Sequence, residues 1–504
     1  MANAKSTSPY QRSAPKLDKT NYILTLSKLF AYRQKNGFND LSFAAGLPGH
    51  KIPQSVQTAI ASVAKQASSA YPDYDPKAPI TSKILQPKIA AFHQFHFGGE
   101  VAAEETGFAP GSTAILQALA AITGNYNKTA ILPHPGYPLM QEPLRNALSH
   151  ISLYAAIKPN ETTKRWELSK EQLAAALEYH REENSFLYFN FPSNPTGYSP
   201  TAEEYQEIVR ILMKEIKIRQ ERKLPPPCIL EDQAYAMMMH DGRRFYSIFN
   251  AINDMRQKIA AQDKSKENNK QLELLDIIEK CVVVAHSFSK TFAAAGDRVA
   301  YWVCKNPEMQ KSISTTINSS QLTPSRSSLA VANAILEEKQ YDTEAMREYG
   351  HRLRHLENSL NSIFLSAKKT NRTLALIPDS PIKAKADAGF FATADFSFLQ
   401  NMPIAKEKVA ELRKQLSSCG YEQENEIIFQ NDRINNSFDA SLWLLATSSL
   451  LVIPITASKH NPNQIYLRFS VGCASKEEID QAMGKLEKTL LTEIQPKTQT
   501  LSRL

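Results

Sequence analysis

The chain has 504 residues, of which 42% are hydrophobic and 22% charged, a composition typical of a globular protein and unlike that of a disordered or fibrous one. Its formal net charge of +8 is spread over the whole length and is too dilute to predict nucleic-acid binding. The five cysteines are far apart and form no C-x-x-C pair, so we expect neither a disulfide framework nor a zinc site, and a cytoplasmic, reducing location is favoured.

Residues 1–20 are polar, lack the apolar core of a secretory signal, and are predicted to form a flexible arm. The most apolar stretch of the chain, residues 442–455, contains a threonine, two serines and a proline. It is shorter than the roughly 20 apolar residues that a membrane span needs. The sequence therefore predicts no association with a membrane.

From about Ala109 to Cys304, short β-branched or aromatic runs alternate with longer amphipathic segments. The predicted strands are residues 130–132, 151–155, 186–190, 228–231, 281–286 and 299–304. Thr201 and Glu204 are spaced as a capping box that begins a helix between two of them. This alternation predicts an α/β fold with a mostly parallel sheet covered by helices, in which the chemistry lies at the carboxyl ends of the strands.

Two later segments follow different patterns. Residues 262–280 open with a polar, charged run and are predicted to form a solvated insertion. After about residue 330, a helical pattern precedes strands near residues 389–396 and 465–470. This change predicts a second, smaller α+β domain, joined by residues 20–60 from the start of the chain.

Polar side chains follow three consecutive predicted strands. They are Asn194, then Asp232 and Tyr235, then Ser287, Lys290 and Arg298. Each alone has an ordinary interpretation, as a turn, a helix cap or a solvated charge. At one edge of a parallel sheet, however, the set fits a cofactor with a ring nitrogen, a phenolic oxygen, an aldehyde and a phosphate.

The chemistry of such a cofactor gives each side chain a predicted role. Asp232 could keep a pyridine nitrogen protonated, so that the ring serves as an electron sink. Lys290 could form an imine with the aldehyde and afterwards move protons. Asn194 and Tyr235 could hydrogen-bond the phenolic oxygen, and Tyr137 could stack on the ring.

The phosphate could be held by Ser287 and Arg298, together with N–H groups at a helix start after Gly111-Ser112-Thr113. Ordinary alternatives remain at this point. Tyr137 could be a core aromatic residue, and the Gly-Ser-Thr run could be a plain helix cap.

In this order, the motifs resemble the fold-type I pyridoxal-phosphate (PLP) enzymes, specifically the class I and II aminotransferases, over roughly residues 40–480. The matching motifs are Asn194-Pro195-Thr196-Gly197, Asp232-x-x-Tyr235, and Ser287-x-Ser289-Lys290 followed by Gly296-x-Arg298. The resemblance implies PLP as the cofactor, no metal, and a large domain with a sheet of the seven-stranded type. It also implies a smaller α+β domain built from both chain ends.

The expected divisions are a flexible arm over residues 1–20, the first part of the small domain over 21–60, the PLP-binding domain over 61–330 and the rest of the small domain over 331–495. By the same resemblance, Arg468 would bind the substrate's carboxylate, and the backbone of Gly46 would approach the substrate.

The resemblance also implies that Ser112, Thr113 and Ala114 form the phosphate-binding turn. In a homodimer with shared active sites, Tyr71 or the nearby Tyr74 would reach the partner's phosphate. The chain departs from the family pattern at residues 76–79, which replace a glycine-rich segment, and over residues 420–460.

Three classes of function remain open. The first is an aminotransferase that moves an amino group between an α-amino acid and a 2-keto acid. The second is another PLP enzyme on the same fold: a decarboxylase, a carbon–sulfur lyase or a biosynthetic synthase. The third is a PLP-sensing transcriptional regulator, which is disfavoured because the residues before Gly46 carry no recognition-helix pattern.

Arg468 favours transamination, because a bidentate hold on the carboxylate would leave the α-hydrogen facing the lysine. Alternatively, Arg468 forms a structural ion pair. Arg326 could bind a second carboxylate of the substrate. His134 and His286 either touch the substrate or are hydrogen-bonded structural residues.

Overall fold

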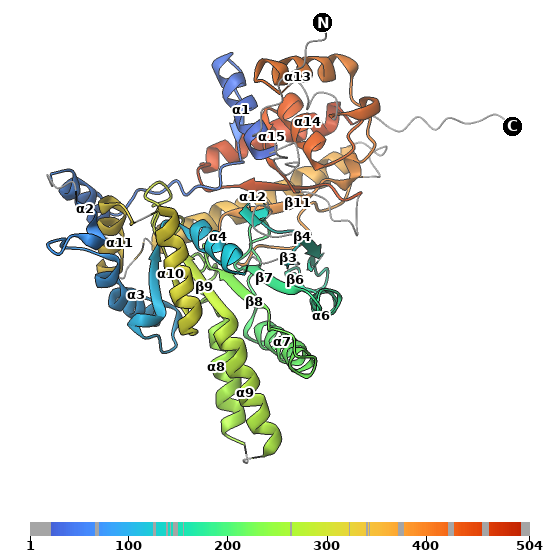
Figure 1. Ribbon diagram of the computed structural model, residues 1–504. Coiled ribbons are helices and arrows are strands. Elements are labelled where there is room, and N and C mark those ends of the chain that lie inside the picture. The colour runs from blue at the N-terminus through green and yellow to red at the C-terminus, as the bar shows by residue number, and fades with distance from the viewer. Residues whose placement is uncertain are drawn as a thin grey trace, which may run out of the picture.

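The computed structural model describes residues 22–65, 70–123, 128–137, 140–141, 143–144, 150–154, 156–262, 265–321, 323–338, 341, 343–370, 377–421, 428–455 and 463–494. The predicted arm over residues 1–20 lies outside the described residues. Figure 1 shows a larger part built around a central sheet and a smaller part that contains both ends of the described chain.

A seven-stranded sheet lies at the centre of the larger part, with the strand order β2-β10-β9-β8-β7-β3-β4. Its strands are β2 (Thr106–Ala109), β3 (Lys128–Pro133), β4 (His150–Tyr154), β7 (Asn184–Asn190), β8 (Cys228–Asp232), β9 (Val282–Ser287) and β10 (Ala300–Cys304). The strands from β4 to β9 pair in parallel, and β10 is antiparallel to both of its neighbours. The predicted mostly parallel sheet is confirmed, and each of the six predicted strands overlaps an observed one.

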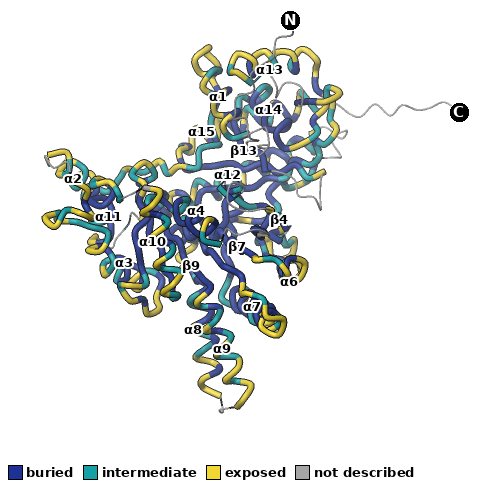
Figure 2. Tube along the Cα trace, viewed as in Figure 1, coloured by how far each residue is buried: buried dark blue, intermediate teal, exposed yellow. Residues whose placement is uncertain are grey.

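The strands are apolar on both faces because helices cover the sheet on both sides. Every residue of β8, β9 and β10 is buried, and Figure 2 shows the strands as a continuous buried layer. Successive residues alternate between two cores: Val282 and Val284 face one, and Val283 faces the other. Continuous hydrophobic strands are the pattern expected of a parallel sheet with two covered faces.

The covering helices of this part are α2 (Gln54–Ala64), α3 (Ser82–Phe97), α4 (Ser112–Ile122), α6 (Lys170–Tyr179), α7 (Ala202–Glu221), α8 (Ile248–Ala260), α9 (Lys266–Cys281), α10 (Pro307–Gln321) and α11 (Arg326–Glu338). Helix α7 begins at the predicted capping box, where Thr201 and Glu204 each accept the other's backbone N–H. A short hairpin of β5 (Ile157–Pro159) and β6 (Trp166–Leu168) lies beside the sheet strands.

The segment predicted as a solvated insertion forms a helix instead. Helices α8 and α9 make a hairpin that projects from the sheet, with its tip exposed (Figures 1 and 2). Leu275, Ile278 and Cys281 on α9 are buried, and α9 packs against α7 and α8. The polar run over residues 265–270 is mostly exposed, as predicted, whereas the second half of residues 262–280 is partly buried, because its apolar residues recur at helical spacing.

The smaller part contains helices and short strands from both ends of the described chain. Its helices are α1 (Tyr22–Lys35), α12 (Thr343–Thr370), α13 (Lys406–Ser418), α14 (Ser437–Ser448) and α15 (Lys476–Thr492). Its strands are β1 (Leu41–Ser42), β11 (Phe391–Asp395), β12 (Leu450–Leu451), β13 (Ile453–Ile455) and β14 (Tyr466–Ser470). Strand β14 lies between β11 and β13 in an antiparallel sheet, and β1 pairs in parallel with β12.

Leu26, Leu29 and Phe43 share one core with residues of α12, β14 and α15, so that residues near both chain ends pack together. Helix α2, by contrast, packs on α11, and its Val56 joins the core of the central sheet. Residues 54–60 thus contact the sheet side of the molecule, although the predicted boundary placed them in the small domain. The other predicted boundaries stay predictions.

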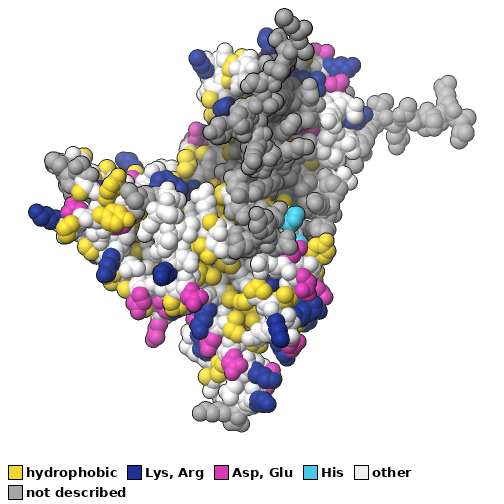
Figure 3. All heavy atoms as spheres, in the orientation of Figure 1, with side chains coloured by type: hydrophobic (Ala, Val, Ile, Leu, Met, Phe, Trp, Pro, Cys, Tyr) yellow, Lys and Arg dark blue, Asp and Glu magenta, His cyan; other side chains and the backbone are white. Residues whose placement is uncertain are grey.

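Across the described chain, no helix combines the length and the apolar character needed to cross a membrane. The face shown in Figure 3 carries lysine and arginine side chains interspersed with aspartate and glutamate. This mixture agrees with a net charge that is dispersed over the sequence.

Candidate active site

A cavity of about 560 Å³ lies where the carboxyl ends of β7, β8 and β9 meet the segment after β1 and the strands β12 to β14. Eleven of the predicted site residues line it: Gly46, Ser112, Thr113, Tyr137, Asn194, Asp232, Tyr235, Ser287, Lys290, Arg298 and Arg468. Two do not. Ala114 is buried in the first turn of α4, and Tyr71 is 58% exposed on the surface.

Lys290 follows β9 and reaches across the cavity to the segment after β1. Its Nζ donates a hydrogen bond to the carbonyl oxygen of Gly46 at 2.6 Å. Burial lowers the pKa of Lys290 to about 8, and the positive charges of Arg468 and Arg298 act in the same direction. A lysine whose pKa is lowered in this way spends more of its time as the neutral, nucleophilic amine.

Asp232 ends β8 and is buried, and among the described residues only one of its two carboxylate oxygens has a hydrogen-bond partner. The hydroxyl of Tyr188, on the neighbouring strand β7, donates to Oδ2 at 2.9 Å. Oδ1 has no hydrogen-bond partner among the described residues, and burial raises the pKa of Asp232 to about 6. A buried carboxylate oxygen without a donor fits a ligand that brings an N–H group.

Sequence analysis missed Tyr188, although its position carried a signal. Tyr188 lies on β7 two residues before Asn190, and side chains two apart on a strand share a face. Its partner β8 is aligned so that Tyr188 pairs with Leu230 and Asn190 pairs with Asp232. The register between β7 and β8 brings the phenol to the carboxylate. The sequence alone does not give this register, so the contact could not be predicted from it.

The start of α4 forms a cradle with the loop after β9. Gly111 caps α4 with φ = +89° and without a side-chain hydrogen bond, so that the first N–H groups of the helix stay available. A β-carbon at Gly111 would come within 2.3 Å of Nη2 of Arg298. The positive φ favours glycine at this position, and a guanidinium beside a helix N-terminus fits an anion such as phosphate.

Ser287 and Ser289 complete the cradle. The Ser287 hydroxyl donates to Oγ of Ser289 at 2.8 Å and accepts from the Ser289 N–H at 3.2 Å. Ser289 also lines the cavity, although only Ser287 was predicted as a phosphate ligand.

Arg468, on β14, carries a buried positive charge without a carboxylate partner among the described residues. Its Nη1 donates to Oδ1 of Asn194 at 3.0 Å, and its Nη2 donates to the carbonyl oxygen of Ala44 at 2.5 Å. Its Nε is buried and unpaired, and burial lowers its pKa to about 10. The alternative prediction of a structural ion pair finds no support in these contacts, and the guanidinium fits an anionic ligand.

Two tyrosines lie near these groups. Tyr235 is buried edge-on to the rings of Phe390 and Phe391, and burial raises the pKa of its phenol. Tyr137 is half-buried in the cavity wall, and burial raises its pKa as well. Both phenols are therefore protonated near neutral pH and able to donate hydrogen bonds.

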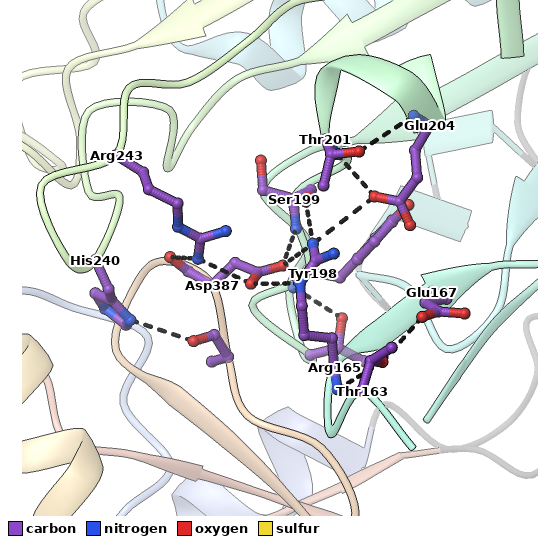
Figure 4. Close-up of polar contacts among 12 residues, drawn as sticks. Thr163, Arg165, Glu167, Tyr198, Ser199, Thr201, Glu204, His240, Arg243 and Asp387 are labelled. Carbon is purple, nitrogen blue, oxygen red and sulfur yellow. Dashed lines mark hydrogen bonds and ion pairs between the residues drawn. The ribbon is translucent and has the colours of Figure 1, made fainter. Parts of the chain in front are cut away.

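Asp387 contacts the segment that follows Asn194, and Figure 4 shows its contacts with Ser199, Arg165 and Arg243. The Asp387 carboxylate accepts hydrogen bonds from Arg165, from Arg243 at 2.9 Å and from the Ser199 N–H at 3.1 Å. The backbone N–H of Asp387 donates to the carbonyl oxygen of Gly197 at 2.9 Å. Three segments distant in sequence are thereby joined beside the Asn194 turn.

The remaining sequence candidates lie away from the cavity. Arg326 donates to the carbonyl oxygen of Ala70 and lies 3.9 Å from Asp75, so it does not take part in the site as described. His286, on β9, packs among aromatic rings, and both its ring nitrogens are buried and unbonded within the described residues. Neither prediction for His286 holds. His134 lines a small cavity of about 30 Å³ that shares Asn194 and Arg468 with the main one.

Comparison with known proteins identifies the family. The sequence matches the family described as aminotransferase class I and II over residues 37–486. The chain belongs to this family. The predicted family, fold class and transferase class are therefore confirmed, and the members of this family are PLP-dependent enzymes of fold type I.

Individual relatives are distant. An LL-diaminopimelate aminotransferase of Methanocaldococcus jannaschii is 26% identical over 289 residues, which cover 56% of this chain and 57% of that enzyme. A kynurenine–oxoglutarate transaminase of Dictyostelium discoideum is 22% identical over 368 residues, which cover 70% and 75%. Among solved structures, an aspartate aminotransferase from Rhizobium meliloti superposes with a TM-score of 0.65 at 18% identity, covering 93% of this chain and 95% of that one.

Proposed function

We propose that this protein is a PLP-dependent aminotransferase that moves an amino group between an α-amino acid and a 2-keto acid. The observation that carries the proposal is the meeting of three groups in one cavity. They are a lysine with a lowered pKa, a buried carboxylate with one oxygen unbonded, and a buried guanidinium, the last two without a further partner among the described residues.

The residues present fit PLP group by group. Oδ1 of Asp232 would accept the ring N–H, while Tyr188 holds the other oxygen. The first N–H groups of α4 and the side chains of Ser287 and Arg298 suit the phosphate. Bound there, the cofactor would supply an electron sink for the negative charge that develops at the substrate's α-carbon.

Further groups would hold the ring in place. The amide N–H₂ of Asn194 stays available for the phenolic oxygen, because its Oδ1 already accepts from Arg468. Tyr235 would donate to the same oxygen, and Tyr137 would lie against the ring. Ser112 and Thr113 open α4 beneath the phosphate, and the buried Ala114 packs behind them.

Arg468 would bind the substrate's α-carboxylate and so select the reaction. Two N–H groups of a guanidinium can bind one carboxylate in a fixed plane. The bond that breaks at the α-carbon is the one perpendicular to the cofactor ring. Binding by Arg468 would keep the carboxylate out of that direction, and it would turn the α-hydrogen towards Lys290 as the base. A decarboxylase needs the opposite arrangement, so transamination is favoured over that alternative. Gly46, whose carbonyl meets Nζ of Lys290, would border the substrate.

The proposal includes a homodimer in a reducing, cytoplasmic location. Tyr71 and Tyr74 are 58% and 66% exposed, which suits a side chain that reaches into a second copy. The segment that carries Tyr71 is fixed by Arg326, which donates to the carbonyl oxygen of Ala70. All five cysteines are free thiols, which agrees with a reducing compartment.

Product analysis tests the reaction type. The purified protein, loaded with PLP, is incubated with an amino acid that bleaches its visible absorbance and with an added 2-keto acid. We expect a new amino acid to form in step with loss of the first. Release of carbon dioxide in step with substrate loss, without a new amino acid, would instead assign a decarboxylase.

A further inference from the structure

The cavity is lined by a few charged residues and by a larger set of uncharged ones. Its charged lining residues, among those the structure describes, are Asp232, Lys290, Arg298 and Arg468. The proposed function already assigns a partner to each: the ring nitrogen, the aldehyde, the phosphate and the α-carboxylate. The described lining therefore holds no further charge for a substrate's side chain.

The uncharged lining residues include several large apolar side chains to which the proposed function assigns no role. The apolar wall of the cavity is formed by Ile23, Phe30, Leu47, Met140, Leu451 and Ile453. Helix α1 contributes through one face, because Ile23, Ser27 and Phe30 recur at helical spacing. Leu26 and Leu29, on the adjoining face of α1, are buried in the core of the smaller part.

Two serine hydroxyl groups of the uncharged lining, those of Ser27 and Ser42, contact the backbone of their own segments. The Ser27 hydroxyl donates to the carbonyl oxygen of Ile23 at 2.7 Å. The Ser42 oxygen accepts from the N–H of Ala44 at 3.5 Å. A second carboxylate placed here would lose water and would meet no cation among the described lining residues beyond those already assigned.

We propose that the amino acid bound best by this site carries an apolar side chain, and that it is not a dicarboxylic amino acid. The inference rests on the proposed function, since Arg468 must hold the α-carboxylate for the side chain to face α1. An apolar chain gains free energy by leaving water for this wall, whereas an acidic chain would be desolvated without compensation. Each methylene that fits an apolar pocket contributes a factor of about 10–200 to the preference.

Binding of unreactive carboxylates tests the inference without any turnover. The PLP-loaded protein is titrated with 4-methylvalerate, which has the carbon skeleton of leucine, and with glutarate, which has that of glutamate. Calorimetry gives the two dissociation constants. We expect 4-methylvalerate to bind at least about tenfold more tightly than glutarate. Equal or tighter binding of glutarate would overturn the inference. This holds even if the cation that binds the second carboxylate of glutarate comes from a second copy of the chain.

Variants of α1 locate the effect. Phe30→Ala should weaken 4-methylvalerate binding by about tenfold and leave glutarate binding unchanged. The matched control is Phe95→Ala, a residue 64% exposed on α3 and outside this cavity, which should alter neither. A Phe30→Ala protein that binds both ligands as the parent does would contradict the role of α1.

The two proposals can fail separately. If no amino acid undergoes transamination, the proposed function fails, while the ratio of the two dissociation constants still reports the character of the pocket. If transamination occurs and dicarboxylic ligands bind more tightly, the proposed function stands and only the substrate class is overturned.

Discussion

At the scale of single residues, we expect the chemistry to depend most steeply on Asp232. Asp232→Asn keeps the shape of the side chain but removes the charge that would hold a proton on the ring nitrogen. The variant should retain most of its PLP and lose at least about 100-fold in kcat/KM. Absorbance spectra measure the cofactor, and steady-state rates measure the activity.

The matched control for this variant is Asp241→Asn. Asp241 is exposed and has a positive φ of 58°, a conformation that asparagine tolerates well. It should change neither cofactor content nor rate. Near-normal turnover in Asp232→Asn would contradict the role assigned to Asp232.

Arg468→Lys should act mainly on substrate binding. A lysine places one ammonium where two guanidinium nitrogens now contact Asn194 and Ala44, so it cannot present a planar pair of donors to a carboxylate. We expect KM to rise by about 100-fold or more, with a smaller change in kcat. Arg352→Lys, at a partly exposed position on α12, serves as the control. An unchanged KM in Arg468→Lys would remove Arg468 from the substrate site.

The main site residues could be predicted from sequence because each lies just after a predicted strand. Parallel strands bring such positions to one edge, so Asn194, Asp232 and Lys290 needed only the strand order along the chain. Tyr188 required the register between β7 and β8. Ile23 and Phe30 line the same cavity as Leu451 and Ile453, more than 400 residues later, and no local pattern predicts that proximity.

At the scale of elements, the position of the Asn194 turn depends on the segment around Asp387. Asp387→Asn leaves Arg165 and Arg243 facing a neutral group, and both guanidinium groups are partly exposed. We expect a loss of about 1–3 kcal/mol in unfolding free energy and weaker PLP binding. Denaturant titration and cofactor titration measure the two effects.

Asp379→Asn is the control, because Asp379 pairs with Lys368 on the exposed surface. Its unfolding transition should coincide with that of the parent. If the unfolding transition of Asp387→Asn also coincides with that of the parent, the contacts of Asp387 do not hold the Asn194 turn.

Elements could be predicted where their patterns were local. The capping box at Thr201 and Glu204 marks the start of α7 within four residues of sequence. Helix α9 was missed, because a polar first turn hides the apolar face of Leu275 and Ile278. The contacts of Asp387 join residues distant in sequence, and no spacing rule could link them.

At the scale of the whole molecule, the protein freed of PLP should become less stable as the pH rises through the weakly acidic range. Burial raises the pKa of Asp232 and Asp439 to about 6 and that of Glu231 to about 7. Between the unfolded values near 4 and these folded values, the folded state holds protons that the unfolded state has released. The unfolding free energy therefore falls as the pH rises through that window.

Thermal unfolding of the cofactor-free protein between pH 5 and pH 7.5 measures this dependence. Asp232→Asn should remove the contribution of Asp232 to the pH dependence of the unfolding free energy. This contribution is at most about 3 kcal/mol for a shift of two pKa units. Addition of PLP should also remove this contribution, because a ring N–H beside Oδ1 favours the ionised carboxylate. A pH profile that neither the substitution nor PLP alters would contradict the burial of an open carboxylate.

The central claim is that Lys290 carries the cofactor, and covalent labelling tests it most directly. The protein loaded with PLP is reduced with sodium borohydride, digested and analysed by mass spectrometry, with Lys290→Ala as the control. We predict a pyridoxyl group on the peptide that contains Lys290, and no label in the variant. A label on another lysine of the parent protein, or no label at all, would contradict the account.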